Sequence, residues 1–573
     1  MDFDQLEWFN RTNHTSSHQK RHIGFAHPVK PDSCERITFL DKDERCKYAH
    51  NNPSCRDQVF IINYNAFFYC TCDNDDLLSL ACIILLLVEC VLLFWAIYFT
   101  TIRYFVPALT LIARMLNMNE YVAGETIITL GNNAPGIFGS VLGLTNKSRH
   151  AYSDTMSVSL FMGVFTSSII MWVKPFAIDA VYFVRCVGFV VLYVTFVDFS
   201  VFLTKGFLTI GWAVSMTLIF PIYLTLILCD QYMQNRKDRE HASNLRNAES
   251  SAVPVTGEPA NIRSEMASRS PNDKLFRQFF RIFNTLDKNR FNSAWTFCKM
   301  WALFKVLPMI VLRVLIPEIY LNQSSESYSK LLCCIQITLT PTFIVVLFVD
   351  KFESLRGWKL TVIIMCLVIL LPFSFMAFSF SRTDTVPKWY KFTEALNILG
   401  CFTVLFTMTI ELNALLEAVG IVLSRSHTFI GCTLYTWGSG WSDLLINLNM
   451  ARNGLPRMAY AACFGSIIIS IFSSVCIPYL YSTITSPRKG VVCYVTEGTL
   501  GSTASCFLVT ALIIKILYAT TTNFMLRRTG ALLGVVFYSL FLIFCFFSEF
   551  EIVHAYGTDH TLDHTHFDES YSN

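Results

Sequence analysis

Long apolar runs separated by short polar connections extend over most of the chain. A helix needs about 20 mainly apolar residues to cross the roughly 30 Å hydrocarbon core of a bilayer, and twelve runs have this character. None of them alternates apolar and polar residues with a period of two, which argues against a β-barrel. The pattern therefore predicts an all-α polytopic membrane protein with roughly 12 spans. The predicted spans are Leu77–Ile102, Pro107–Leu144, Ser153–Val173, Ala177–Leu203, Leu208–Cys229, Leu331–Val349, Leu360–Phe380, Ala395–Val422, Thr428–Met450, Met458–Tyr481, Leu500–Tyr518 and Ala531–Phe550.

Polar stretches divide the chain into five predicted parts. An extracytoplasmic, cysteine-containing head covers residues 1–76, and a first transmembrane half covers residues 77–229. Residues 230–330 form a loop rich in Lys and Arg that ends in an interfacial helix. Basic loops stay on the cytosolic side, or on the matrix side of an inner membrane, which places the head on the opposite side after five spans. A second transmembrane half covers residues 331–550, and a polar tail covers residues 551–573.

The segment Trp301–Tyr320 is apolar but interrupted. It contains Lys305, Arg313 and two prolines, so we predict a helix that lies in the membrane interface rather than one that crosses. The nearby glycosylation sequence at Asn322 weakly favours the opposite interpretation.

The head carries signals of an oxidising, glycosylating compartment. Asn10 and Asn13 each begin an Asn-x-Thr sequence, which makes both residues candidate glycosylation sites. Five cysteines precede the first span, which predicts one or two disulfides and leaves one thiol over. The alternative is a set of unpaired thiols beside chance glycosylation sequences. The five cysteines are Cys34, Cys46, Cys55, Cys70 and Cys72.

The composition excludes several classes of function. Hydrophobic residues make up 53% of the chain and charged residues only 15%, against about 25% charged in soluble domains, so lipid is the expected solvent. The net charge of +3, without a basic stripe bearing aromatics, gives no reason to expect a nucleic-acid partner. No phosphate-binding loop, zinc site or nucleophile arrangement is present in the sequence, so we expect no enzyme and no cofactor.

Two short motifs interrupt apolar runs in corresponding places of the two halves. The first is Gly131–Phe138, with two asparagines and a proline, and the second is Gly438–Asn447, with a carboxylate at Asp443. Interrupted segments of this kind mark midplane transport sites, where backbone and side-chain oxygens replace a cation's hydration shell. Small residues that merely let helices pack closely are the alternative for the glycines alone. A carboxylate in the middle of a span favours a functional site.

These residues resemble the two α-repeats of the calcium/cation antiporters. The similarity lies in Gly-Asn-x-Ala-Pro at Gly131–Pro135, in Trp-Gly-x-x-x-x-Asp at Trp437–Asp443 and in the run Ala451–Gly465. It is greatest to the cation/calcium exchanger branch, which includes the mitochondrial-type sodium/calcium exchanger. It extends to Cys46–Cys55 and Ser548–His554, and so covers most of the chain apart from the basic loop.

The resemblance implies two inverted repeats of about five helices each, with alternating access to a cation site between them. It also shows where this chain diverges: Gly136 takes the place of the first-repeat acid, and Ser439 takes that of the second-repeat amide. On the following helix, Ser470 replaces an amide. The implied ligands of the transported cation are Asn132, Ser140, Ser439, Asp443, Asn447 and Ser470.

The predicted function is secondary-active cation antiport, with Ca²⁺ and Na⁺ as the implied ions. Because calcium affinity depends on the number of carboxylates, Gly136 keeps open a monovalent-selective exchanger or a transport-silent relative. Glu411 is a candidate pathway acid, the alternative being a buried acid held by local partners. Expected partners are membrane lipid and inorganic cations, and the oligomeric state is open. The expected location is the plasma membrane or an endomembrane, with the mitochondrial inner membrane as the alternative.

Overall fold

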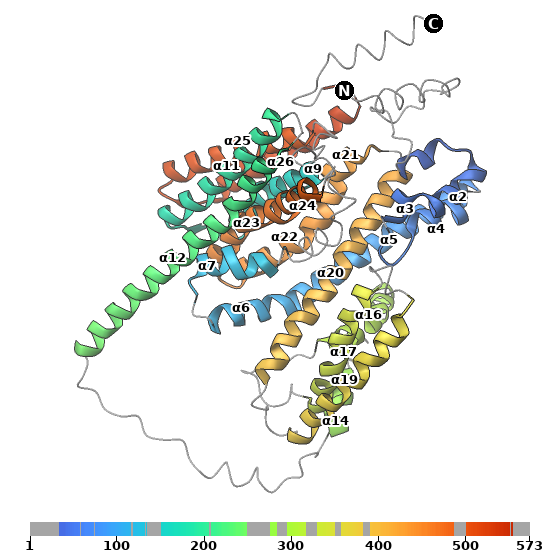
Figure 1. Ribbon diagram of the computed structural model, residues 1–573, viewed down its shortest axis with the longest axis horizontal. Helices are drawn as coiled ribbons and strands as arrows, with labels where there is room; N and C mark the ends of the chain where they lie inside the picture. Colours follow the sequence, from blue (N-terminus) through green and yellow to red (C-terminus); the bar gives the residue numbers. More distant parts are fainter. Residues whose placement is uncertain are drawn as a thin grey trace, which may run out of the picture.

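The computed structural model of the chain is almost entirely helical (Figure 1). Ten of the described helical segments are long and apolar enough to cross a membrane, which confirms the predicted all-α polytopic class. The total of roughly 12 spans stays a prediction. The structure describes residues 34–57, 59–73, 75–115, 118–131, 133, 151–204, 208–248, 275–283, 295–316, 329–349, 357–381, 390–423, 425–485, 500–550 and 552–553.

The elements follow one another as a head, a first half, a linking region and a second half. In the head these are η1 (Cys34–Phe39), α2 (Lys42–Asn51), α3 (Pro53–Asp57), α4 (Tyr64–Phe67) and η2 (Phe68–Cys72). The first half holds α5 (Asp76–Thr100), η3 (Thr101–Phe105), α6 (Val106–Met115), α7 (Glu120–Ala123), η4 (Gly124–Ile128), α9 (Ala151–Leu160), η5 (Phe161–Thr166), α10 (Ser167–Val173), β1 (Phe176–Ala177), α11 (Ala180–Leu203) and α12 (Ile210–Ala248). The linking region holds α14 (Leu275–Phe283) and α16 (Thr296–Leu315). The second half holds α17 (Lys330–Val349), α19 (Lys359–Phe380), α20 (Tyr390–Val422), α21 (His427–Ile430), η7 (Gly431–Tyr435), α22 (Thr436–Arg452), α23 (Pro456–Ile471), η8 (Phe472–Cys476), α24 (Ile477–Thr485), α25 (Leu500–Thr521), β2 (Met525–Leu526) and α26 (Arg528–Glu549).

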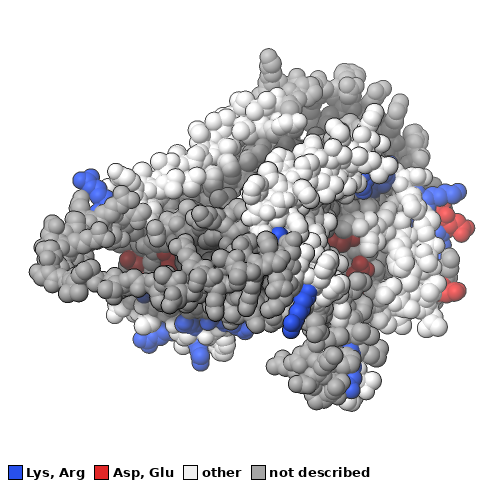
Figure 2. Space-filling view, turned by 90° about the horizontal axis from the view of Figure 1, so that it is seen from below, with Lys and Arg blue, Asp and Glu red and all other residues white. Residues whose placement is uncertain are grey.

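The outer surface of the bundle is apolar. Helix α19 has no buried residue, and its Leu360 and Phe375 are 71% and 73% exposed. Figure 2 shows a described surface that is mostly white, with few charged side chains scattered over it. An apolar surface of this extent needs hydrocarbon around it, as the composition predicted.

One predicted boundary is wrong. The second span was expected to begin at Pro107, but the helical chain continues through α5, η3 and α6 to Met115, and the next helix begins at Glu120. Pro107 is tolerated because it follows the π-helical turn η3, where the hydrogen-bond ladder is already irregular. The real start is set by Asn119, whose side chain accepts a hydrogen bond from the N–H of Tyr121 (3.3 Å) and caps the helix.

The contacts of the bundle distinguish two ends. At the head end, the N–H of Ile61 donates to Glu411 on α20, and Ser426 donates to Glu549 at the close of α26. At the other end, β1 pairs antiparallel with β2. This sheet end carries basic side chains, which mark the cytosolic or matrix side of a membrane protein. These are Lys174, Arg452, Arg457, Arg527 and Arg528.

Helix α16 covers most of the segment that was predicted to lie in the membrane interface. It is not among the ten segments that are long and apolar enough to span. The interfacial placement of Trp301–Tyr320 stays a prediction.

The two motif helices run in opposite directions, as inversion requires. The helix that begins at Glu120 starts at the sheet end, where Tyr121 accepts a hydrogen bond from the N–H of Asp179 (3.0 Å). Helix α22 finishes at that end, because its following turn at Gly454 lies beside Lys174. The chain therefore enters one motif from the side on which it leaves the other.

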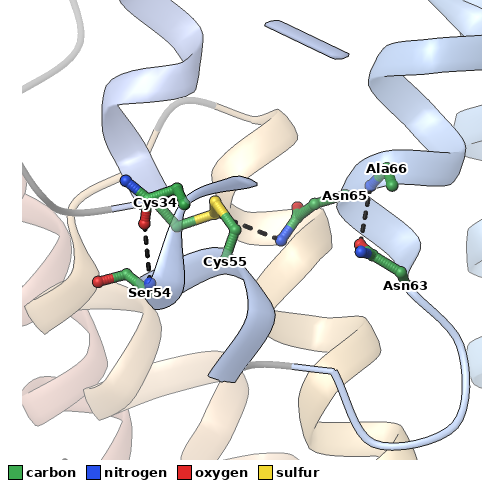
Figure 3. The surroundings of a disulfide bond; sticks show 7 residues. Cys34, Ser54, Cys55, Asn63, Asn65 and Ala66 are labelled. Carbon is green, nitrogen blue, oxygen red and sulfur yellow. Dashed lines mark hydrogen bonds between the residues drawn. A yellow bond between two sulfur atoms is a disulfide. The ribbon is translucent and has the colours of Figure 1, made fainter. Parts of the chain in front are cut away.

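The head is held by three disulfides. Cys34 pairs with Cys55, and Asn65 donates to the Cys34 sulfur (Figure 3). A second disulfide joins Cys46 to Cys70 and a third joins Cys72 to Cys82. The prediction of one unpaired thiol in the head is therefore wrong. Cys72 pairs with Cys82, which lies within the first two turns of α5, in a run that was interpreted only as a membrane span.

Candidate functional site

Each motif helix contains a π-helical turn built in the same way. Gly124 begins η4, and the hydroxyl of Thr129 donates to the Gly124 carbonyl (2.5 Å). Gly431 begins η7, and the hydroxyl of Thr436 donates to the Gly431 carbonyl (2.9 Å). π-Helical turns shift the backbone ladder by one residue, release carbonyl oxygens and recur at functional sites. Both halves therefore open the helix just before their motif.

This repeated geometry supports the alignment of the two motifs. Gly131 and Gly438 each lie two residues beyond the bonded threonine of their repeat, and Gly136 and Asp443 each lie seven residues beyond it. The one carboxylate of the predicted pair is thus in the second repeat only. Asn132, Gly136 and Ser140 lie outside the described residues.

Asp443 is buried near the middle of the bundle, 6% exposed. It lies nine residues before the end of α22, which corresponds to about 14 Å along the helix axis and so to mid-depth in a bilayer. Within the described residues, no hydrogen bond or ion pair to its carboxylate is found. A carboxylate placed this way is costly to bury unless a cation compensates it.

Asn447 lies one turn after Asp443 on the same face of α22 and is fully buried. Its amide nitrogen donates to the Cys463 sulfur on α23 (3.7 Å). Its Oδ1 is a buried oxygen without a hydrogen-bond partner in the described part of the chain. Asp443 and Asn447 together present oxygens, the ligand type that Na⁺ and Ca²⁺ require.

Ser439 lies one turn before Asp443 and is contacted from α20. Asn413 donates its Nδ2 to the Ser439 hydroxyl (3.0 Å), while the Asn413 Oδ1 has no hydrogen-bond partner among the described residues. A Cβ at Gly438 would lie 2.4 Å from that Oδ1, so only glycine lets the amide approach. Asn413 thus supplies an amide beside the position where the resemblance shows one missing.

Ser470 joins the two repeats. Its hydroxyl donates to Oδ1 of Asn133 (2.5 Å), and the Asn133 Nδ2 donates to the Thr129 carbonyl (3.0 Å). Asn133, the second asparagine of the first motif, therefore lies against Ser470. The contact holds the first motif against α23, the helix that follows the second.

Glu411 is held by the head. Its carboxylate accepts hydrogen bonds from the N–H groups of Ile61 (3.0 Å) and Ile62 (3.1 Å) and from the Tyr64 hydroxyl (2.9 Å), which also donates to Glu89 on α5 (3.0 Å). Its partners are distant in the sequence, in keeping with a buried acid that holds two helices to the head. Its role in the ion pathway stays a prediction.

The predicted ligands are thus only partly joined by direct contacts. Ser439, Asp443 and Asn447 share α22, and Ser470 reaches the first motif through Asn133. Three polar residues at the site were missed: Asn133, Asn413 and Cys463. Asn133 and Asn413 carried a signal, being amides inside apolar runs beside residues already singled out.

The fold and the site define a class. A bundle that crosses the membrane many times, contains two oppositely directed copies of one interrupted helix and buries acceptor oxygens at mid-depth has the architecture of inverted-repeat transporters.

Comparison with known proteins narrows this class. The family model of the sodium/calcium exchanger protein matches residues 358–549. The mitochondrial sodium/calcium exchanger proteins of Rattus norvegicus and Gallus gallus are 23% and 25% identical, covering 91% and 92% of this chain and 90% and 92% of their own lengths. Cation/calcium exchanger 2 of Arabidopsis thaliana is 22% identical over 78% of this chain and 79% of its own. A solved structure of the sodium-calcium exchanger NCX_Mj matches with a TM-score of 0.41 and 13% identity, over 80% of this chain and 97% of that one.

These similarities confirm the resemblance found in the two motifs. The chain is similar to the sodium/calcium exchanger family over residues 358–549, and over most of its length to mitochondrial sodium/calcium exchangers and cation/calcium exchangers.

Proposed function

We propose that this chain is a secondary-active antiporter that exchanges Na⁺ for Ca²⁺ across its membrane by alternating access. The observation that carries the proposal is Asp443: a buried mid-depth carboxylate to which no described residue forms a hydrogen bond or ion pair. The relatives named sodium/calcium exchangers support the choice of ions.

The residues present could perform this exchange as follows. A cation that reaches mid-depth replaces its water with the Asp443 carboxylate, the Asn447 Oδ1 and oxygens released by the π-helical turns. Ca²⁺ and Na⁺ compete for the same oxygens, so binding of one favours release of the other. Glycine contacts such as the one at Gly438 let the helices approach closely around the site.

The experiment is flux into proteoliposomes that contain the purified protein. An outward Na⁺ gradient should drive uptake of radioactive Ca²⁺, and Asp443→Asn should reduce it at least about a hundredfold, because a unit charge near 4 Å contributes about 4 kcal/mol at an effective dielectric of about 20. The matched control is Asp179→Asn, since Asp179 caps α11 through Val181 and asparagine caps equally well. Uptake by Asp443→Asn equal to that of the control would refute the proposal.

The same vesicles separate the alternatives. Sodium flux without calcium flux would indicate a monovalent-selective exchanger, in line with a single carboxylate. Flux of neither ion in the wild-type protein would indicate a transport-silent relative.

The membrane is proposed to be the plasma membrane or an endomembrane, with the mitochondrial inner membrane as the alternative. The disulfide-bonded head favours an oxidising compartment on the head side. The candidate glycosylation sites Asn10 and Asn13 lie outside the described residues. Localisation of a tagged chain, with a glycosidase-induced gel shift that disappears in the variant Asn10→Gln/Asn13→Gln, tests this placement.

A further inference from the structure

A lysine lies inside the bundle at the depth of the site. Lys515 on α25 is only 7% exposed, and its ammonium donates to the carbonyls of Gly163 (2.8 Å) and Val164 (3.3 Å) and to the hydroxyl of Ser167. In the described part of the chain, no carboxylate oxygen lies within 4 Å of it. The ammonium therefore has neutral oxygens around it and no counter-ion in contact.

The oxygens that receive Lys515 are available because of the local backbone. Gly163 and Val164 belong to the π-helical turn η5, and Ser167 follows it directly. Carbonyl and hydroxyl oxygens released from a helix in this way are the groups that coordinate bare cations in membrane transporters. We call these three oxygens, the carbonyls of Gly163 and Val164 and the hydroxyl of Ser167, the cradle. Chemically the cradle is a monovalent-cation site that is filled by the ammonium of Lys515.

The cradle lies beside the candidate transport site. The turn η5, which supplies two of these oxygens, packs against α22 and α23: a Cβ at Gly440 would lie 2.5 Å from the Phe161 ring, and a Cβ at Gly163 would lie 2.8 Å from Ile467. Lys515 is six residues from the sheet end of α25 and Cys463 is seven residues from the sheet end of α23, so both lie about 10 Å from that end. The ammonium is therefore about one helical turn from Asp443 in depth.

We infer that Lys515 is a resident monovalent cation of the transport core and determines which cations the site takes from solution. It occupies oxygens that would otherwise hold a free Na⁺, and its charge offsets that of Asp443. The inference rests on the proposed function. It assigns a lower calcium affinity and one fewer Na⁺ per cycle to this chain than to the same core with a neutral residue at position 515.

The test compares Lys515→Met with Lys515→Arg in the flux assay. For a separation on the order of 10 Å and an effective dielectric of about 20, removing the ammonium charge strengthens binding of a monovalent cation about tenfold and of a divalent cation about a hundredfold. Lys515→Met should therefore lower the half-saturating Ca²⁺ concentration and raise the Hill coefficient for Na⁺, while Lys515→Arg keeps both near wild type. A folded Lys515→Met with unchanged calcium and sodium dependence overturns the inference.

Folding is controlled separately. Lys515→Gln keeps an N–H donor for the same carbonyls without the charge. It therefore replaces Lys515→Met in the flux assay if the methionine variant does not fold. Loss of folding in both neutral variants would overturn the specificity role, because the ammonium would then be required by the fold itself.

Failure of the proposed function gives a different result. If the wild-type protein transports nothing, the same variants are compared by the rise in unfolding temperature that NaCl or CaCl₂ produces. A larger rise in the neutral variants supports Lys515 as the resident cation, and an equal rise overturns it.

Discussion

Arg185 on α11 connects three helices near the sheet end, and we expect its removal to destabilise the bundle strongly. Its guanidinium contacts Glu125 on η4 (3.1 Å) and Asp230 on α12 (2.6 Å). The Glu125 side chain is 1% exposed, whereas that of Asp230 is 36% exposed. The substitution Arg185→Met leaves the Glu125 carboxylate buried without its cation. The Asp230 carboxylate also loses its partner, but it remains partly exposed.

The magnitude follows from this difference in exposure. Breaking a buried ion pair from one side costs about 3–5 kcal/mol, because an uncompensated charge stays buried. The exposed half of the bridge contributes at most about 1 kcal/mol. With an unfolding entropy of about 2.1 cal/mol/K per residue, a chain of 573 residues loses about 1 °C of unfolding temperature per kcal/mol, so Arg185→Met should unfold about 3–5 °C below wild type.

The assay is a double-mutant cycle followed by intrinsic tryptophan fluorescence in detergent, for which the chain has 10 tryptophans. Glu125→Gln alone should cost about 1–2 kcal/mol, and the double variant Arg185→Met/Glu125→Gln should unfold above Arg185→Met alone. Asp230→Asn is the matched control, with an expected change below about 1 °C. Losses that simply add in the double variant would show that the two side chains do not stabilise each other.

Three further outcomes are expected. Gly124→Ala should lower the unfolding temperature by about 1–3 °C, because its Cβ would lie 2.4 Å from a carbonyl of α23, while Gly188→Ala, with open space around it, should not. Tyr64→Phe removes the hydroxyl that donates to Glu411 and should loosen the head. Added protease should then cleave the head faster than in wild type, and equal cleavage rates would contradict a stabilising role of this hydrogen bond. Gly136→Asp should lower the half-saturating Ca²⁺ concentration in the flux assay, and a rise would contradict the alignment of the repeats.

The sequence pattern predicts the spans well because burial in lipid is a property of composition. Runs such as Lys359–Phe380 are apolar on every face, so no knowledge of neighbours is needed. Composition does not fix where a helix begins when the chain stays apolar. Pro107 suggests a boundary, yet the π-helical turn before it absorbs the proline, and the cap at Asn119 sets the start instead.

The site residues were easiest to predict where they share one helix. Asp443 and Asn447 are four residues apart, and this spacing alone predicts that both lie on one face of α22. Asn413 comes from another helix, and only the packing of that helix shows that it reaches the site. The partner of Cys72 was missed for the same reason, since a cysteine within an apolar run is interpreted as a small hydrophobic residue.

The charges of the core explain how a divergent repeat can remain selective. In the family pattern each repeat offers an acid, whereas here the first repeat has Gly136 and the second has Asp443. Lys515 adds a positive charge about a turn away in depth, opposite in sign to the Asp443 carboxylate. A monovalent or divalent ion that enters must then be held mainly by neutral oxygens, and the amides of Asn133, Asn413 and Asn447 are the residues that supply them. The number and spacing of these dipoles then act together with the charges of Asp443 and Lys515 in setting selectivity.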